Sequence, residues 1–278
     1  MVVTFRRVSV ENCLHLIHQT NFNLMKKISL LLEMVCLTIT SIFGQPSRFA
    51  AEKYTNGKGD TLQYRLLTPD YALRQKYPLV IFLHGSGERG NDNEKQLQWG
   101  VQNFATDQMM VAHPAFVLAP QCPEKVSWSN FDRKKGNREM ILLTEPSKPM
   151  ELLIALIHEI IKKNPVDSTR IYITGLSMGG FGTYDALERH PELFAAAVPV
   201  CGGGDTSKAA SIASIPLWIF HGADDAAVDP LCSMDMMEAL LKAGAHPGLT
   251  IYPSVGHFSW LGAYTEPAMY EWLFRQHK

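Results

Sequence analysis

The chain has 278 residues, of which 46% are hydrophobic and 19% are charged. This ordinary globular composition excludes a wholly disordered, collagen-like or coiled-coil chain. The 26 Lys and Arg residues against 27 Asp and Glu residues leave a net charge of −1. Such a balance provides no basic surface for nucleic acid and no polybasic patch for a membrane, so we expect no nucleic-acid partner.

The N-terminal region has the pattern of an export signal, but not at residue 1. Met25 and two lysines precede an apolar stretch over residues 28–43, which is the order of a secretory signal peptide. We interpret Met25 as the true start, residues 1–24 as a non-native upstream extension and residues 25–44 as the signal peptide. A buried N-terminal helix is the alternative.

A charged residue inside the apolar stretch, Glu33, argues against a permanent membrane anchor. The sequence therefore predicts export, to the periplasm or the exterior of a bacterium. No repeat, low-complexity tract or linker interrupts residues 45–278, and we expect them to form a single domain of about 230 residues.

Short apolar runs alternate with helical patterns through this domain. Residues 61–66 alternate polar and apolar side chains, as in an antiparallel edge strand. Five buried strands are predicted at residues 78–83, 115–119, 170–174, 195–200 and 215–220, a further strand at 249–252, and helices at 151–161, 234–243 and 266–276. The alternation predicts an α/β fold with a mostly parallel central sheet flanked by helices and no large lid.

The motif G-x-S-x-G occupies residues 175–179, between an apolar strand and a helical pattern. In this context the motif is typical of a nucleophile elbow, in which a tight turn exposes the serine oxygen. We therefore predict Ser177 as a catalytic nucleophile; a chance match in a glycine-rich turn is the alternative.

A serine nucleophile needs a histidine base and a carboxylate that orients the base. Asp225 follows the predicted strand at 215–220, and His257 follows the strand at 249–252. Both lie in the chain order expected for this fold. Asp225 is the favoured acid, with Asp224 as the first alternative and Asp229 as the second.

The loop over residues 83–90 also ends a predicted strand and matches G-x-G-x-x-G. A dinucleotide site is rejected because no helix begins at once. We predict instead that the backbone N–H groups of Ser86 and Met178 form an oxyanion hole. Within the loop, Glu88 and Arg89 are expected to form a bracing salt bridge, with a catalytic role as the alternative. His84, like His221 at another strand end, is expected to support a loop.

Three cysteines remain after the predicted signal peptide, namely Cys122, Cys201 and Cys232. Their spacing matches neither a disulfide framework nor a metal site. We expect Cys201 to be an ordinary core residue, although one disulfide is the alternative in an exported protein. No metal and no cofactor are predicted.

The substrate pocket is expected between residues 85–104 and residues 122–131. Two aromatic residues of the second segment, Trp128 and Phe131, are candidates for stacking on a sugar or an aromatic acyl group. Capping of the core is the alternative role for Trp128.

Four motifs resemble the α/β-hydrolase superfamily, and within it bacterial secreted esterases of the prolyl-oligopeptidase-like or predicted-peptidase group. They are L-H-G-S-G-E-R-G at 83–90, A-P-Q-C-P at 119–123, R-I-Y-I-T-G-L-S-M-G-G at 170–180 and F-H-G-A-D-D at 220–225. The resemblance covers about residues 50–278. It implies a triad of Ser177, Asp225 and His257 and hydrolysis of carboxylic esters without a cofactor.

These observations predict a secreted serine carboxylesterase acting on small-molecule or glycan esters, with short acyl groups such as acetyl or feruloyl. Prolyl oligopeptidases carry a β-propeller for which this chain has no room, and this difference argues against peptidase action. A serine peptidase of the prolyl-oligopeptidase-like type, acting on small peptides, is the alternative. A hydrolase-fold module that only binds ligand is a third hypothesis, against which the intact triad argues. The sequence specifies neither an oligomeric state nor a natural ester.

Overall fold

The structure is a computed structural model that describes residues 47–70, 75–133 and 138–278. The predicted upstream extension and signal peptide lie outside these residues. Among the residues described, no helix combines the length and the apolar character needed to cross a membrane. Residues 48–278 form one compact unit.

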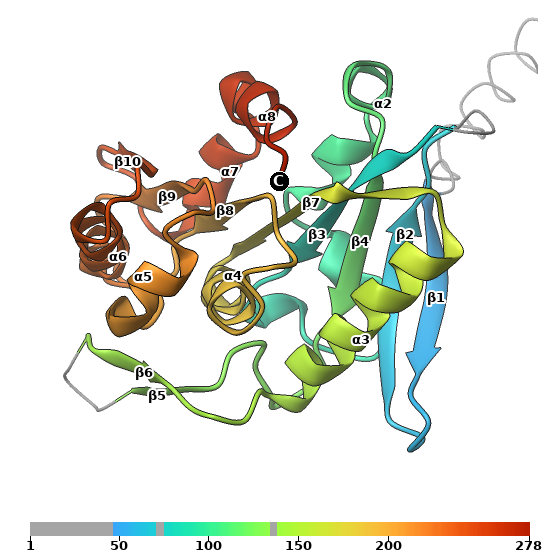
Figure 1. The fold of residues 1–278 in the computed structure, drawn as a ribbon, viewed down its shortest axis with the longest axis horizontal. Coiled ribbons are helices and arrows are strands. Elements are labelled where there is room, and N and C mark those ends of the chain that lie inside the picture. The colour runs from blue at the N-terminus through green and yellow to red at the C-terminus, as the bar shows by residue number, and fades with distance from the viewer. Residues whose placement is uncertain (1–46, 71–74, 134–137) are drawn as a thin grey trace, which may run out of the picture. The chain divides into compact units, whose positions relative to one another are not determined.

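A sheet of eight strands has the order β1-β2-β4-β3-β7-β8-β9-β10 (Figure 1). The pairs β1/β2 and β2/β4 are antiparallel, and all pairs from β4 to β10 are parallel. The strands are β1 (Phe49–Thr55), β2 (Thr61–Leu67), β3 (Tyr77–Leu83), β4 (Phe116–Gln121), β7 (Val166–Leu176), β8 (Ala196–Val200), β9 (Trp218–Gly222) and β10 (Gly248–Tyr252). The α/β fold and its mostly parallel sheet are confirmed.

The prediction of an edge strand at residues 61–66 was half wrong. β2 is antiparallel, but β1 pairs along its other side and is the true edge. The side chain of Asn56 closes this hairpin by accepting from the backbone N–H groups of Lys58 and Asp60. β1 escaped prediction because its side chains are mostly exposed, which leaves no apolar pattern.

Helices cover both faces of the sheet. The strand β3 supplies alternate residues to two cores, with Leu79 and Ile81 in one and Val80 and Phe82 in the other. The first core packs against α3 (Lys148–Lys163), α4 (Met178–Arg189), α5 (Ala209–Ile212) and α6 (Leu231–Lys242); the second packs against the short helices η2 (Lys95–Leu97), η3 (Val101–Ala105), α7 (Trp260–Ala263) and α8 (Pro267–Leu273). Burial on both faces is the arrangement that the apolar runs predicted.

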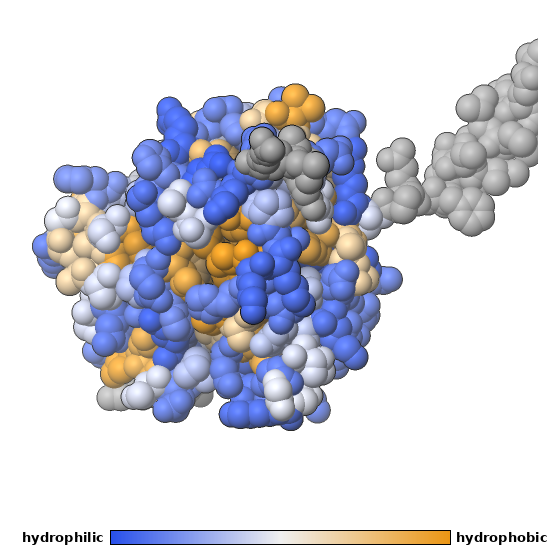
Figure 2. Space-filling view, turned by 45° about the vertical axis from the view of Figure 1, so that its right-hand side comes forward, coloured by the Kyte–Doolittle hydropathy of each residue, from blue (hydrophilic) through white to orange (hydrophobic). Residues whose placement is uncertain are grey.

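The remaining elements are peripheral. α2 (Asp107–Ala112) precedes β4, and a two-stranded sheet of β5 (Phe131–Arg133) and β6 (Met140–Leu142) stands apart from the main sheet (Figure 1). The last helix is shorter than predicted, since α8 begins at Pro267 after the Glu266 cap and ends at Leu273. Mostly hydrophilic residues cover the face in Figure 2, and apolar residues show between them.

One buried carboxyl group in α4 has few hydrogen-bond partners. Glu188 accepts one hydrogen bond, from the backbone N–H of Asp205 at 2.9 Å, through Oε1. Its Oε2 atom has no partner among the described residues. Burial raises the pKa of this carboxyl to about 9, so the folded protein keeps Glu188 protonated at neutral pH.

We expect the neutral isostere Glu188→Gln to stabilise the protein in a pH-dependent manner. Unfolding exposes a carboxyl that ionises above its ordinary pKa of 4.5, so the native residue's contribution is complete below pH 4.5 and is lost as the pH rises towards 9. In urea titrations, the gain in free energy of unfolding caused by Glu188→Gln should therefore be about 4 kcal/mol larger at pH 8 than at pH 5. Glu192→Gln, at an exposed position, is the control, and a gain independent of pH would contradict the buried-acid account.

Candidate active site

Ser177 occupies a strained turn between β7 and α4. Its φ and ψ angles are 53° and −116°, in a region that residues with a side chain rarely adopt. The turn is held from two sides, because the N–H of Ser177 donates to the oxygen of Val200 and its carbonyl accepts from the N–H of Phe181. The structure therefore has the backbone geometry of the predicted nucleophile elbow.

The glycines of the elbow allow backbone to approach backbone. A methyl group at Gly179 would overlap the carbonyl oxygen of Leu83, and one at Gly180 would overlap the carbonyl oxygen of Val200. A methyl group at Gly175 would in turn overlap the oxygen of Gly179. The first turn of α4 thus lies directly against the ends of β3 and β8, and no side chain fits between them.

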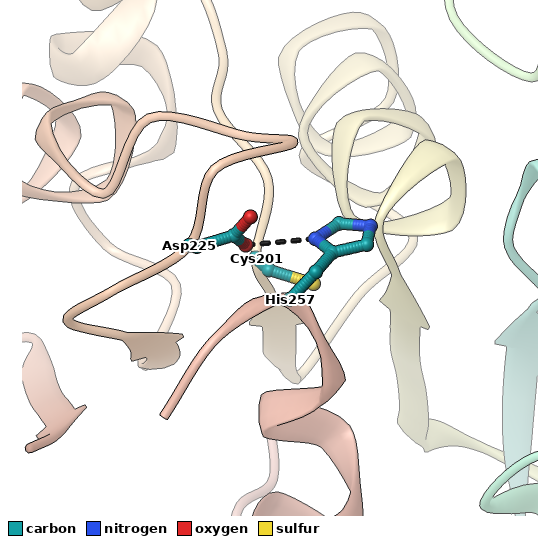
Figure 3. A group of neighbouring side chains, drawn as sticks. All are labelled: Cys201, Asp225 and His257. Carbon is teal, nitrogen blue, oxygen red and sulfur yellow. Dashed lines mark hydrogen bonds and ion pairs between the residues drawn. The ribbon is translucent and has the colours of Figure 1, made fainter. Parts of the chain in front are cut away.

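Three side chains from separate loops form one hydrogen-bonded chain. The Nε2 atom of His257 lies 2.9 Å from the Oγ atom of Ser177. On the other side of the ring, Nδ1 lies 2.7 Å from Oδ2 of Asp225 (Figure 3). Asp225 is buried, whereas the side chain of His257 is 23% exposed. This is the arrangement of nucleophile, base and orienting acid.

The two alternative acids are placed elsewhere. The backbone N–H of Asp224 donates to the oxygen of Val255, so this residue helps to join the β9 and β10 loops. The carboxylate of Asp229 accepts from the N–H of Leu231 at the start of α6. Of the three candidate carboxylates, Asp225 is the one that the structure hydrogen-bonds to His257.

Asp225 is buried but favours its charged form. Burial by itself would raise the pKa of the carboxyl, yet hydrogen bonds from His257 and from the N–H groups of Val228 and Ala227 outweigh it and lower the pKa. The ionised carboxylate accepts the Nδ1 proton of His257 and leaves Nε2 free to accept from Ser177. The charge of the Asp225 carboxylate thus favours the tautomer of His257 that carries its proton on Nδ1.

The two strand-end histidines support loops, as predicted. Burial lowers the pKa of His84 to about 4, so its ring is neutral. Because Nε2 accepts from the N–H of Cys122, the proton is on Nδ1, which donates to the oxygen of Gly85. Burial also lowers the pKa of His221, whose ring bonds to Ser233 and Val228.

The two predicted oxyanion donors are the first residues of two helices. Met178 opens α4, and Ser86 opens η1 (Ser86–Glu88) directly after the end of β3. Within the described part of the chain, neither backbone N–H has an acceptor. An oxyanion hole requires N–H groups without an acceptor in the protein, and both predicted donors meet this condition.

The salt bridge expected between Glu88 and Arg89 is not formed in the described structure. Arg89 donates from Nε to the oxygen of Val126 and from Nη1 to the oxygen of Ser86. Glu88 is buried, and burial raises the pKa of its carboxyl. The loop is therefore braced by hydrogen bonds to carbonyls rather than by an ion pair.

Cys201 lies beside the buried end of the hydrogen-bonded chain (Figure 3). Its sulfur, a carboxylate oxygen of Asp225 and a ring nitrogen of His257 all lie within 4.8 Å of one another. The Asp225–His257 hydrogen bond already occupies two of these groups, and burial raises the pKa of the Cys201 thiol to about 12. Cys122, Cys201 and Cys232 are all buried and free.

A pocket of about 330 Å³ opens beside Ser177. Both segments that were expected to flank the substrate contribute to its wall, which consists of Arg89, Ser127, Ser129, Phe131, Arg133, Ser177, Met178 and Phe181. Phe131 thus lines the pocket as anticipated.

Trp128 does not line this pocket, so its prediction as a substrate contact was wrong. Its side chain is fully buried, and its Nε1 donates to the backbone oxygen of His84 at 3.1 Å. It packs against α4, because a methyl group at Gly182 would overlap its Cβ atom. The alternative interpretation, that Trp128 caps the core, is the one observed.

Sequence reasoning missed Phe181 and Arg133. Phe181 follows Ser177 by four residues, and that spacing on a helix places two side chains on one face, so a signal was available. Arg133 lies in β5, outside the main sheet, where the strand-end rule gives no guidance.

Comparison with known proteins adds the family. Residues 72–264 match the model of the family described as phospholipase/carboxylesterase. Acyl-protein thioesterase 1 homolog 2 of Dictyostelium discoideum is 29% identical over 180 residues, which are 59% of this chain and 78% of that protein.

Solved structures of esterases are also similar to this chain. A structure described as a thermostable esterase is 41% identical with a TM-score of 0.77, and the match covers 83% of this chain and 64% of that one. A ferulic acid esterase is 18% identical with a TM-score of 0.61, covering 81% and 96%. The second likeness concerns the fold alone.

We expect Gly179→Ala to disrupt the elbow. The added methyl group would overlap the Leu83 carbonyl oxygen, so α4 has to move away from β3. The free energy of unfolding should fall by about 3 kcal/mol in urea titrations. Gly57→Ala is the control, because a methyl group there would meet nothing within 4 Å; equal losses in the two variants would contradict the close-contact account.

Proposed function

The chain belongs to the phospholipase/carboxylesterase family of α/β-hydrolases, whose members are esterase-type hydrolases, and we propose that it is a secreted serine carboxylesterase. The single observation that carries this proposal is the hydrogen-bonded chain from Ser177 through His257 to Asp225. Secretion rests on the sequence pattern of residues 25–44 alone.

The proposed reaction has two half-reactions. Ser177 Oγ attacks the ester carbonyl carbon while His257 Nε2 takes the hydroxyl proton. As the tetrahedral intermediate collapses, the C–O bond to the alcohol breaks and His257 returns the proton to the departing oxygen. Water then attacks the acyl-enzyme with His257 as base, which releases the acid and restores the Ser177 hydroxyl. No cofactor enters either step.

Two features of the site support this mechanism, one of the backbone and one of a side chain. The N–H groups of Met178 and Ser86 are available to the oxyanion, and stabilisation of that charge commonly lowers the barrier to acyl transfer more than any other single interaction. The lowered pKa of Asp225 keeps a negative charge beside the imidazolium that forms during attack. Both groups are in place before the substrate arrives, so little reorganisation is needed.

We expect Ser177→Ala to abolish hydrolysis of 4-nitrophenyl acetate, with a loss in kcat of at least about 1000-fold. The native protein should react with a fluorophosphonate probe at Ser177, and the variant should not. Ser254→Ala is a control, since that serine lies outside the hydrogen-bonded chain. Labelling of the Ser177→Ala protein, or its unchanged activity, would refute the proposed nucleophile.

The substrates that we propose are small-molecule or glycan esters with short acyl groups. A pocket of about 330 Å³ is at the small end of ligand sites and fits a short acyl group. Esters are favoured over peptides because an alkoxide leaves more readily than an amine. The relatives that suggest the ester class are the thermostable esterase and the thioesterase homologue.

We expect 4-nitrophenyl esters to be hydrolysed with a kcat/KM at least about 100-fold above that of the matching 4-nitroanilides. The measurement compares 4-nitrophenyl acetate and butyrate with dipeptide 4-nitroanilides on one enzyme preparation. The Ser177→Ala protein provides the background rate for both series. Faster cleavage of the anilides would favour the peptidase alternative.

A further inference from the structure

The pocket beside Ser177 carries two guanidinium groups and no acidic residue in its described lining. Arg89 enters from the loop after β3, and Arg133 enters from β5. The remaining polar lining residues are serines, which are neutral donors. The described lining therefore carries two positive charges and no negative charge, which suits an anionic group of a ligand.

Arg89 is held in place without a carboxylate partner. Its Nε and Nη1 atoms donate to the backbone oxygens of Val126 and Ser86. No ion pair of Arg89 with a carboxylate occurs within the described residues. Carbonyl oxygens fix the guanidinium but do not neutralise it, and the positive charge remains available to the pocket.

Arg133 is fixed by an aromatic ring instead. Its Cζ atom lies 4.6 Å from the centroid of the Phe181 ring, which is the geometry of a cation–π contact. Arg133 is exposed and has no ion-pair partner among residues 47–70, 75–133 and 138–278. Phe181 is itself a lining residue, so the contact holds the second guanidinium at the pocket wall.

The pocket lies on the acyl side of the scissile bond. Its lining includes Ser177 and Met178, and His257 is not part of it. In the proposed mechanism His257 has to reach the oxygen of the leaving alcohol, so the alcohol lies on the histidine side. The acyl group then extends from the Ser177 oxygen, past the Met178 N–H, into the pocket that holds the arginines.

We propose that this pocket selects acyl groups that end in a carboxylate, so that the preferred substrates are monoesters of dicarboxylic acids. A guanidinium matches a carboxylate in shape and can donate two parallel hydrogen bonds to it. The serines at the wall provide further donors. This inference rests on the proposed esterase function and adds the chemical class of the acyl group.

The test compares two esters of nearly equal size and reactivity, the mono-4-nitrophenyl ester of adipic acid and its methyl-capped neutral counterpart. We expect the native enzyme to hydrolyse the anionic ester with a kcat/KM about tenfold higher, mainly through a lower KM. Because exposed charges are screened by salt, the preference should shrink when NaCl is raised to about 0.5 M.

Arg133→Gln should lower the ratio of kcat/KM for the anionic ester to kcat/KM for the neutral ester about fivefold. Arg133→Lys should restore part of the preference. Arg275→Gln removes the same charge from an exposed position near the C-terminus and should affect neither ester. Arg133 is the better position to change, because Arg89 also bonds to the loop that carries Ser86.

Two kinds of failure can be told apart. If neither ester is hydrolysed in a Ser177-dependent manner, the esterase proposal itself fails. If the neutral ester is hydrolysed normally and the anionic ester is no better, or if Arg133→Gln lowers both rates equally, the esterase proposal stands and the carboxylate pocket is refuted.

Discussion

The contact between the first turn of α4 and the ends of β3 and β8 is the constraint on which the rest of the site depends. It is a contact of backbone with backbone, since a methyl group at Gly179 or Gly180 would overlap a carbonyl oxygen of the neighbouring strand. The same contact holds Ser177 in its strained conformation, because Val200 accepts the hydrogen bond of the Ser177 N–H. It also places the start of the loop that follows β3, which carries Ser86, against the backbone of the elbow. Strain at one residue is maintained by the packing of three elements.

Two buried carboxyl groups show how local donors decide charge in this fold. Asp225 accepts hydrogen bonds from two backbone N–H groups and from His257, and its pKa is lowered despite burial. Glu188 accepts from one N–H only, and burial raises its pKa to about 9. The difference lies in the number of donors that solvate each anion. The turn at residues 225–228 therefore supplies a stabilisation that Glu188, in the last turn of α4, cannot obtain from its own helix, since helical N–H groups are already used by helical carbonyls.

The sequence predicted the positions of side chains correctly where they follow the ends of parallel strands. Parallel strands end at a common edge, so Ser177, Asp225 and His257 could be predicted to meet although 80 residues separate the first from the last. Where no such rule exists, prediction failed. Trp128 lies in an irregular segment whose side-chain directions have no period, and it turned inward to donate to the oxygen of His84. Arg133 belongs to a small hairpin outside the sheet, and only the folded chain shows that its side chain reaches the ring of Phe181. Edge strand β1 was missed because exposed strands carry little apolar pattern.

The groups of the site come from two kinds of element, the constrained start of α4 and the surrounding loops, and these differ in how readily their residues can be substituted. Ser177, the Met178 N–H and the Phe181 ring all come from the elbow and a single helical turn, so the proposed nucleophile, one oxyanion donor and one wall of the pocket move as a unit. The two guanidinium groups come from outside it, Arg89 from a loop and Arg133 from a peripheral hairpin. Residues in surface loops and peripheral hairpins tolerate substitution better than residues at buried contacts between backbone segments. The proposed acyl transfer is thereby tied to the most constrained part of the fold, while the charge proposed to meet the acyl group is set by residues that can vary without moving Ser177. A family that keeps the elbow can therefore acquire different acyl preferences by changing the lining of this one pocket.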